Sequence, residues 1–443
     1  MRGNHVLHRS TGARPPIAVD GEGIYLIDGN GRRYIDACGG AAVSCLGHRH
    51  PAVIRAMTEQ ANRLEYAHTG FFTTEAAEEL GAVIADVSPG ALDRVWFTSS
   101  GSEATEAAVK LARQYHLERG EPGRSRLIAR KFSYHGNTLG ALAAGGSVWR
   151  RAPYDPLLID VTLIDPCFEY RFAEPGESAE EYGRRAADDL EQEIERLGPD
   201  TVIAFIAETV VGATAGAVPP VPGYFRRIRE VCDKYGVLLI LDEVMCGSGR
   251  TGTFLACEQD GVVPDIATLG KGLGAGYQPI GAVICTTAVY DAIAEGSGAL
   301  KHGQTYNAHP VGCAAAVAVQ EVVRGENLLH RVKQAGARLF ELLDDRFGDH
   351  PHVGDIRGRG LLQAIELVAD RQSKAPFDAA LKLHERAKKD AFERGLLIYP
   401  GAGTADGQSG DHILLAPPYN VSDDEIDLIV DLLGQTIDAV VPS

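Results

Sequence analysis

An apolar run that ends in two carboxylates constrains the fold of this chain more than any other stretch. Residues 237–241 are five consecutive apolar residues, and Asp242 and Glu243 follow them directly. Such a run is typical of a buried parallel strand, and open α/β sheets bind ligands beyond the carboxyl ends of their strands. A buried Asp needs a cationic or hydrogen-bonded partner, or it takes up a proton. The sequence therefore predicts a ligand crevice at Asp242, with a cation facing that carboxylate.

The pattern of an apolar strand with a polar residue at its end recurs through the middle of the chain. Residues 201–207 form an apolar run that Glu208 follows, and residues 266–270 run directly into Lys271. Segments with helical periodicity separate these strands. Their alternation predicts a mostly parallel, doubly wound α/β sheet.

Lys271 is badly placed for a solvated charge, because it ends a buried strand and glycines flank it. Lysines in dry surroundings have lowered pKa values and serve as Schiff-base formers. A structural salt bridge to Asp242 or Glu243 is the alternative interpretation of the same residue.

Residues 98–113 predict a helix whose N-terminus could bind phosphate. A short strand at 94–97 precedes the helix, and residues 99–102 supply hydroxyls, a glycine and free backbone N–H groups. A plain serine cap with a capping box accounts for this motif equally well. Tyr134 and His135 stand just before a glycine, although either residue alone is more typical of a structural role.

Composition narrows the classes of molecule that this protein could bind. The 443 residues favour two domains, and the net charge of −17 disfavours a nucleic acid or an anionic membrane, since a phosphate backbone requires a basic face. Eight cysteines without a CxxC pair indicate buried free thiols in a reducing cytoplasm, and we expect no metal site. The first eight residues lack the apolar region of a signal peptide, and no apolar run approaches about 18 residues. We therefore expect a cytoplasmic protein.

A literal G-x-G-x-x-G motif at 247–252 is not expected to bind a dinucleotide, because no helix is predicted to start within it. The remaining segments predict a meander of small antiparallel strands at the start and a smaller domain at the end. The expected elements are strands at 17–36, helices at 51–62, 74–87, 311–323 and 328–347, an alternating run at 353–367, a helix at 377–394, a strand at 396–399 and a capped helix from 422.

Several motifs, in this order, resemble those of the class III, or omega, aminotransferases, which are pyridoxal-phosphate enzymes of fold type I. The resemblance runs from residue 18 to residue 431. The motifs are Phe-Thr-Ser-Ser-Gly-Ser-Glu-Ala at 97–104, Tyr-His-Gly at 134–136, Ala-Glu at 207–208, Leu-Asp-Glu-Val at 241–244, Gly-Arg-Thr-Gly at 249–252, Thr-Leu-Gly-Lys at 268–271, Thr-Tyr-Asn-Ala-His-Pro at 305–310 and Leu-Ala-Pro-Pro at 415–418.

The resemblance implies a role for each matching residue. Lys271 would bind the cofactor's aldehyde and later carry the substrate proton, while Asp242 would keep the pyridine nitrogen protonated. Tyr134 and Val244 would sandwich the ring, and Glu208 would help to position the groups around its oxygen. The implied catalytic residues are Lys271 and Asp242, and the implied cofactor-binding residues are Ser100, Gly101, Ser102, Tyr134, His135, Glu208, Asp242, Val244, Lys271 and Thr305.

The resemblance also implies an architecture and an assembly. A large cofactor-binding domain at 66–318 would carry a mostly parallel sheet of the seven-stranded type, and residues 1–65 and 319–443 would form a smaller α+β domain. Thr305 matches a phosphate-binding residue that the neighbouring subunit donates. The active site would therefore exist only in a homodimer or in a tetramer built from it.

The chain departs from the family at one position. Many members that use pyruvate carry an arginine just before a Gly-Asp-His motif, but this sequence has Gly407 near that place. Trp149, Arg150 and Arg151 are candidates to receive a substrate carboxylate, although surface or interface roles would also suit them. The motif Tyr-Gln-Pro at 277–279 resembles the pyruvate-using branch.

The leading hypothesis is a transaminase that moves an amino group from an amine or an omega-amino acid to an oxo acid such as pyruvate by a ping-pong mechanism. A phospho-lyase or ammonia-lyase on the same scaffold is the alternative, since fold does not settle the reaction. A non-enzymatic binding role is disfavoured because Lys271 and Asp242 are both present.

Overall fold

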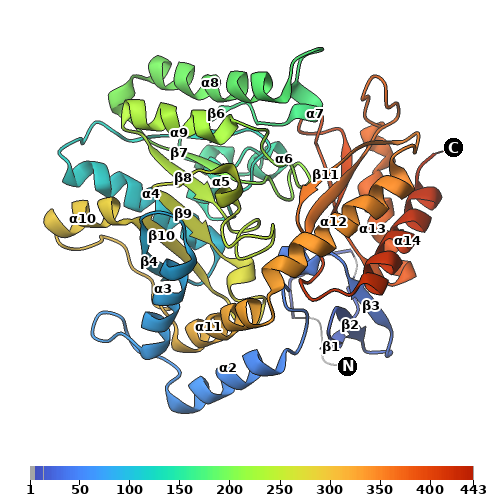
Figure 1. The fold of residues 1–443 in the computed structure, drawn as a ribbon, viewed down its shortest axis with the longest axis horizontal. Coiled ribbons are helices and arrows are strands. Elements are labelled where there is room, and N and C mark those ends of the chain that lie inside the picture. Colours follow the sequence, from blue (N-terminus) through green and yellow to red (C-terminus); the bar gives the residue numbers. More distant parts are fainter. Residues whose placement is uncertain (1–4, 13, 443) are drawn as a thin grey trace.

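Three sheets organise the computed structural model, which describes residues 5–12 and 14–442 (Figure 1). The largest sheet has seven strands in the order β4-β10-β9-β8-β7-β5-β6. Every strand in it is parallel to the others except β10, which pairs antiparallel with β4 and β9. The strands are β4 Leu92–Thr98, β5 Arg126–Arg130, β6 Val161–Ile164, β7 Val202–Glu208, β8 Leu238–Asp242, β9 Ile266–Leu269 and β10 Gly281–Thr286. The predicted mostly parallel sheet is confirmed.

The central strands are apolar throughout because both faces of the sheet are covered. All residues of β7 and β8 are buried, as expected for parallel strands between two helical layers. One core contains side chains of α3, α8, α9 and α11, and another contains side chains of α4, α5 and α10. These helices are α3 Glu75–Val87, α4 Gly101–Glu118, α5 Leu139–Ala144, α8 Ala179–Leu197, α9 Tyr224–Tyr235, α10 Thr287–Glu295 and α11 Pro310–Gly325.

Two smaller sheets lie beside the large one and are built from segments in the N-terminal and C-terminal parts of the chain. The first has the order β1-β2-β3-β13, in which β13 pairs with β3 by parallel contacts such as Leu396 with Ile35. The second is antiparallel, with the order β11-β12-β15-β14. The strands are β1 Ala18–Glu22, β2 Tyr25–Asp28, β3 Arg33–Asp36, β11 Val353–Arg359, β12 Leu362–Leu367, β13 Leu396–Leu397, β14 Tyr399–Ala402 and β15 Asp411–Leu415.

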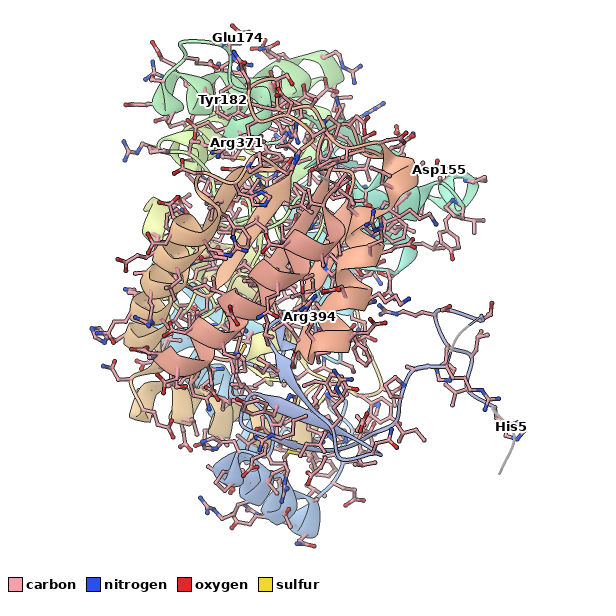
Figure 2. The ribbon with its side chains drawn as sticks, turned by 90° about the vertical axis from the view of Figure 1, so that its right-hand side faces the viewer. His5, Asp155, Glu174, Tyr182, Arg371 and Arg394 are labelled. Carbon is pink, nitrogen blue, oxygen red and sulfur yellow. The ribbon has the colours of Figure 1, made fainter. Side chains whose placement is uncertain are left out.

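Three helices cover the smaller sheets on the side shown in Figure 2, where the N-terminal segment with His5 projects from the body. They are α12 Leu328–Phe347, α13 Leu383–Arg394 and α14 Asp423–Val440. The other helical segments are α1 Gly39–Ala42, α2 Pro51–Arg63, α6 Val148–Arg151, α7 Glu169–Phe172, η1 Asp155–Leu157, η2 Pro199–Thr201, η3 Ala256–Asp260, η4 Lys271–Leu273 and η5 Ala379–Leu381.

Most of the predicted elements are present at nearly the predicted bounds, but two predictions near the C-terminus were wrong. The helix expected at 377–394 begins only at Leu383, because Lys382 has a φ of 50° and separates a short 3-10 turn from α13. The single strand expected at 396–399 is two strands in different sheets, β13 and β14. Ile398 is the residue at which the chain passes from one sheet to the other.

All eight cysteines are free and buried, as predicted. Over the described ranges, no helix combines the length and the apolar character needed to cross a membrane. Residues 1–4, part of the N-terminal stretch in which we expected no targeting signal, lie outside the described residues.

Candidate functional site

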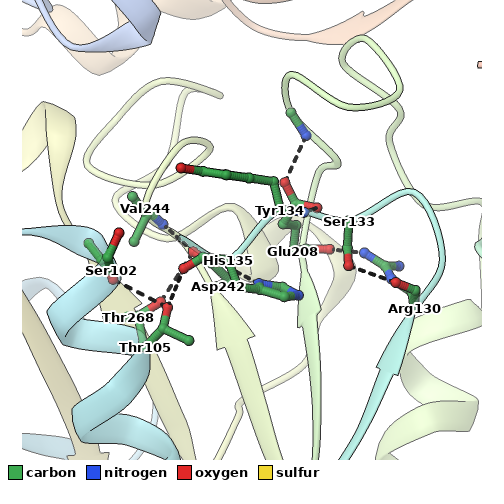
Figure 3. Close-up of polar contacts among 12 residues, drawn as sticks. Ser102, Thr105, Arg130, Ser133, Tyr134, His135, Glu208, Asp242, Val244 and Thr268 are labelled. Carbon is green, nitrogen blue, oxygen red and sulfur yellow. Dashed lines mark hydrogen bonds and ion pairs between the residues drawn. The ribbon is translucent and has the colours of Figure 1, made fainter. Parts of the chain in front are cut away.

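The carboxyl ends of neighbouring strands bring the predicted polar residues to one edge of the large sheet (Figure 3). Glu208 ends β7 and Asp242 ends β8, and the two residues are paired in register. Asp242 is in turn paired with Thr268 of β9. Parallel strands therefore place two carboxylates and a hydroxyl side by side at the sheet edge where the sequence predicts a crevice.

Asp242 is buried, and each of its carboxylate oxygens has partners. Oδ1 accepts hydrogen bonds from the amide of Val244 at 3.0 Å and from the hydroxyl of Thr268 at 3.2 Å. Oδ2 lies 2.7 Å from Nδ1 of His135. Since a carboxylate can only accept, Nδ1 carries the hydrogen. The imidazole is therefore oriented by Asp242, and its buried Nε2 has no hydrogen-bond partner among the described residues.

Glu243 has a different environment, although it is the next residue. Its carboxylate accepts hydrogen bonds from the hydroxyl of Thr209 at 2.7 Å and from the amides of Ala256 and Cys257 at 2.8 and 2.9 Å. Burial raises the pKa of Glu243, and these hydrogen bonds oppose that effect. The side chain thus fixes the start of η3 and makes no hydrogen bond with His135 or Thr268.

Lys271 begins η4 in an unusual backbone conformation. Its φ of 39° is in the left-handed region, which non-glycine residues rarely adopt and which is concentrated at functional sites. In residues 5–12 and 14–442 its side chain makes no hydrogen bond or ion pair, so the alternative of a salt bridge to Asp242 or Glu243 is not observed. Burial lowers the pKa of Lys271, and the charges of Asp242 and Glu208 only partly offset this. The amine is unpaired and is easier to deprotonate than an ordinary lysine.

The start of α4 lies directly against the end of β8. A Cβ added to Gly101 would be 2.6 Å from Cγ1 of Val244, so only glycine permits this approach. Ser100 caps the helix by accepting a hydrogen bond from the amide of Glu103. The amides of Gly101 and Ser102 have no acceptor among the described residues. The serine cap is thus observed without a capping box, and it leaves two N–H groups free for an anion, so the phosphate site stays a prediction.

The Tyr-His-Gly segment packs against the same helix start. A Cβ on Gly136, whose φ is 142°, would lie 2.7 Å from Oγ of Ser102. The hydroxyl of Ser102 in turn accepts a hydrogen bond from the amide of Asn137 at 3.1 Å. The amide of Tyr134 donates to Oε2 of Glu208 at 3.3 Å. Tyr134, His135 and Ser102 therefore belong to one contiguous site with Glu208 and Asp242.

Glu208 is buried beneath this segment. Its second oxygen accepts a hydrogen bond from the amide of Gly212 at 3.1 Å. Burial raises the pKa of Glu208; the proximity of His135 opposes this, and that of Asp242 adds to it.

Thr305 is exposed and is not joined to these residues by any bond within the described chain. Its carbonyl accepts a hydrogen bond from the hydroxyl of Tyr66 at 3.0 Å.

Some residues of the site were not predicted. The hydroxyl of Thr105 donates to the carbonyl of His135 at 2.7 Å, and the guanidinium of Arg130 donates to the carbonyl of Glu208. Thr268 lies in a predicted strand, but its contact with Asp242 depends on strand order and register. Nothing in a single sequence signals these three residues.

A pocket of about 920 Å³ includes Trp149, Arg150, Tyr399 and Gly407 in its lining. The guanidinium carbon of Arg150 lies 4.8 Å from the centre of the Tyr134 ring, so this pocket adjoins the site.

Comparisons with known proteins agree on one family. The family model for class III aminotransferases matches residues 8–437. The chain is 46% identical to an uncharacterized aminotransferase of Schizosaccharomyces pombe, over 99% of this chain and 96% of that one. It is 35% identical to gamma aminobutyrate transaminase 3 of Solanum lycopersicum, over 97% of this chain and 81% of that one. Among solved structures, the chain is 36% identical to an omega transaminase from Pseudomonas jessenii in complex with PMP. The match has a TM-score of 0.92 and covers 98% of this chain and 96% of that one.

Proposed function

The chain belongs to the class III aminotransferases, enzymes that use pyridoxal phosphate, and we propose that it moves an amino group from an amine or an omega-amino acid to an oxo acid, with pyruvate as the acceptor. The observation that carries the proposal is the unpaired amine of Lys271 beside Asp242 at the carboxyl edge of the sheet. A gamma-aminobutyrate transaminase among the relatives supports an omega-amino acid as donor.

The residues of the site fit pyridoxal phosphate. Lys271 supplies a free amine of lowered pKa for the aldehyde, and Gly101 and Ser102 supply unpaired amides for the phosphate. Asp242 keeps acceptor capacity for a protonated pyridine nitrogen, because a carboxylate can accept about four hydrogen bonds. When bound, the cofactor supplies an electron sink for the carbon that loses its proton.

Other side chains would hold the ring in place. We assign one face of the ring to Val244, which Gly101 fixes by close packing, and the other face to Tyr134. His135 would act through Asp242 as a positioning residue, since its Nδ1 holds one oxygen of that carboxylate. Glu208 would position the groups around the ring oxygen, because it anchors the amide of Tyr134 from below.

The chain's own groups would then carry the proton. The neutral amine of Lys271 would accept the proton that leaves the substrate carbon and hold it until it is returned. Because the lowered pKa of Lys271 makes the neutral form more available, the same side chain can act as base and then as acid. Each half of a ping-pong cycle would use this step once.

The proposed assembly is a homodimer in which Thr305 of the partner subunit completes the phosphate site. Three aromatic side chains support an interface on this side of the chain: Phe71 is 83% exposed, Phe72 68% and Tyr306 60%. Exposed apolar groups of this size are typical of surfaces that other proteins cover.

A donor panel with pyruvate and 2-oxoglutarate as alternative acceptors tests the proposed substrates. Adding an amine donor alone tests the reaction class. A transaminase stops after one equivalent, with the bound cofactor in its pyridoxamine form, and resumes when an oxo acid is added. Continuous release of ammonia or phosphate without an acceptor would instead establish the lyase alternative.

A further inference from the structure

The loop at residues 404–410 lies against the segment that contains Arg150. A Cβ added to Gly407 of this loop would lie 3.1 Å from Cγ2 of Val148. Gly407 and Arg150 line the same pocket of about 920 Å³. The guanidinium of Arg150 on α6 therefore borders the same space as the loop at Gly407.

The guanidinium of Arg150 is held between two aromatic rings but has no hydrogen-bond acceptor among the described residues. Its guanidinium carbon lies 4.3 Å from the centre of the Trp149 ring and 4.8 Å from that of Tyr134, so two aromatic rings hold its position. The side chain of Arg150 makes no ion pair or hydrogen bond within residues 5–12 and 14–442, and its Nε is buried. A buried donor without an acceptor is costly unless something binds it.

The neighbouring Arg151, unlike Arg150, has acceptors for its guanidinium. Its guanidinium donates hydrogen bonds to the carbonyls of Ala143 and Gly145 and lies 3.8 Å from Asp155. Its donors are therefore used within the fold. Of the two adjacent arginines, only Arg150 is free.

Other charged groups of the pocket are less suited to the same task. Arg9 is exposed, and His384 is paired with Asp411 at 2.6 Å. Lys388 offers a point charge, whereas a guanidinium presents a planar fork that matches a carboxylate. In a chain of net charge −17, an anionic substrate needs such a local cation.

We propose that Arg150 binds the carboxylate of the oxo acid acceptor, through the free edge of a guanidinium held against Tyr134 and Trp149. The inference rests on the proposed transfer to an oxo acid. It makes Arg150 a specificity-determining residue, because an acceptor without a carboxylate gains nothing from the contact.

The test compares pyruvate with propanal, which lacks the carboxylate, in the holoenzyme and in Arg150→Gln, Arg150→Lys and Arg55→Gln. Arg55 is an exposed arginine of α2 outside the pocket lining and serves as the control. Loss of a charge-assisted bidentate contact should raise KM for pyruvate about 10- to 100-fold in Arg150→Gln and leave KM for propanal unchanged. Arg150→Lys should recover part of the loss, and Arg55→Gln should match the wild type.

Binding of propanoate, with uncharged propanamide as reference, gives a readout without turnover through the fluorescence of the two tryptophans. We expect propanoate to bind the wild type and to lose at least about tenfold in affinity in Arg150→Gln. Equal KM changes for pyruvate and propanal, or unchanged propanoate binding, would overturn the role of Arg150. A wild type that binds propanoate through Arg150 but aminates no oxo acid would overturn the proposed acceptor instead.

Discussion

Asp242 and Glu243 are adjacent carboxylates whose surroundings assign them different tasks. Asp242 contacts His135 and Thr268 at the carboxyl edge of the sheet, whereas Glu243 holds two amides of η3. We expect Asp242→Asn to fold normally, bind the cofactor and lose at least about 100-fold in kcat, because an uncharged amide cannot hold a pyridine nitrogen protonated. Single-turnover absorbance with an amine donor measures this loss.

Glu243→Gln is the matched control, and its effect should be on stability. Its amide group replaces one acceptor oxygen, which leaves at least one buried backbone N–H without a partner and costs about 1–3 kcal/mol of unfolding free energy. The thermal midpoint should fall while kcat per bound cofactor stays near that of the wild type. A larger kcat loss in Glu243→Gln than in Asp242→Asn would refute the assignment.

The lowered pKa of Lys271 predicts a pH dependence for cofactor uptake. Burial disfavours the ammonium, so the reactive neutral amine forms at lower pH than in a free lysine. The rate at which the apoenzyme takes up pyridoxal phosphate should rise with pH, with a midpoint below that of Nα-acetyl-lysine measured in parallel. Glu208→Gln removes a charge that stabilises the ammonium and should lower the midpoint further. Stopped-flow absorbance measures the uptake rate at each pH. A midpoint at or above that of Nα-acetyl-lysine would contradict the prediction.

Single residues of the site differ in how far the sequence could predict them. Lys271 and Asp242 stand out because a charged side chain at the end of a buried apolar strand needs a partner. The pairing of His135 with Asp242 joins residues 107 positions apart and depends on tertiary structure. Arg150 and Arg151 look alike in the sequence, and only their different hydrogen bonding separates them.

At the scale of elements, a buried ionic cluster joins α7 to β11 and β12. Oε1 of Glu366 lies 2.8 Å from Nε of Arg171, and Oε2 lies 2.6 Å from a guanidinium nitrogen of Arg357. Burial alone would raise the pKa of Glu366, but Arg357 and Arg171 outweigh it and hold the pKa below its usual value. The cluster attaches the large sheet's periphery to the smaller antiparallel sheet.

Glu366→Gln should destabilise the protein by about 3–5 kcal/mol at pH 7, because the buried guanidinium of Arg171 loses its carboxylate and that of Arg357 keeps only Asp355. The loss should be fully present above the ordinary glutamate pKa of about 4.3 and should shrink as the pH falls through the lowered pKa. Thermal unfolding midpoints of the wild type and Glu366→Gln, compared between pH 7 and the lowered pKa, measure this loss. Glu393→Gln, which removes an exposed pair with Lys389, should change little, and equal effects of the two substitutions would count against the cluster.

Elements with a single strong pattern were predictable, and those decided by competing contacts were not. β7 and β8 are apolar throughout, and the long helices show clear periodicity. The start of α13 was missed because a left-handed Lys382 has no sequence signal. The division of 396–402 between two sheets was missed because it depends on partners far away in the chain.

At the scale of the whole molecule, the exposed aromatic side chains around Thr305 predict a dimer. Phe71 and Phe72 are exposed, and Tyr66 contacts both Thr305 and Tyr306. Sedimentation velocity should give twice the chain mass of 47.3 kDa for the wild type. Phe71→Asp should shift the protein toward the monomer and weaken cofactor binding. A wild type that remains monomeric and fully active would exclude the shared site.

The central claim is that Lys271 is the residue that holds pyridoxal phosphate. Borohydride reduction of the purified protein, followed by protease digestion and mass spectrometry, tests it most directly, because reduction makes the link between lysine and cofactor permanent. We predict that the cofactor's mass is found on the peptide containing Lys271 and that Lys271→Ala loses both this label and the visible absorbance band. A label on another lysine, or an unlabelled wild type unable to bind pyridoxal phosphate, would contradict the account.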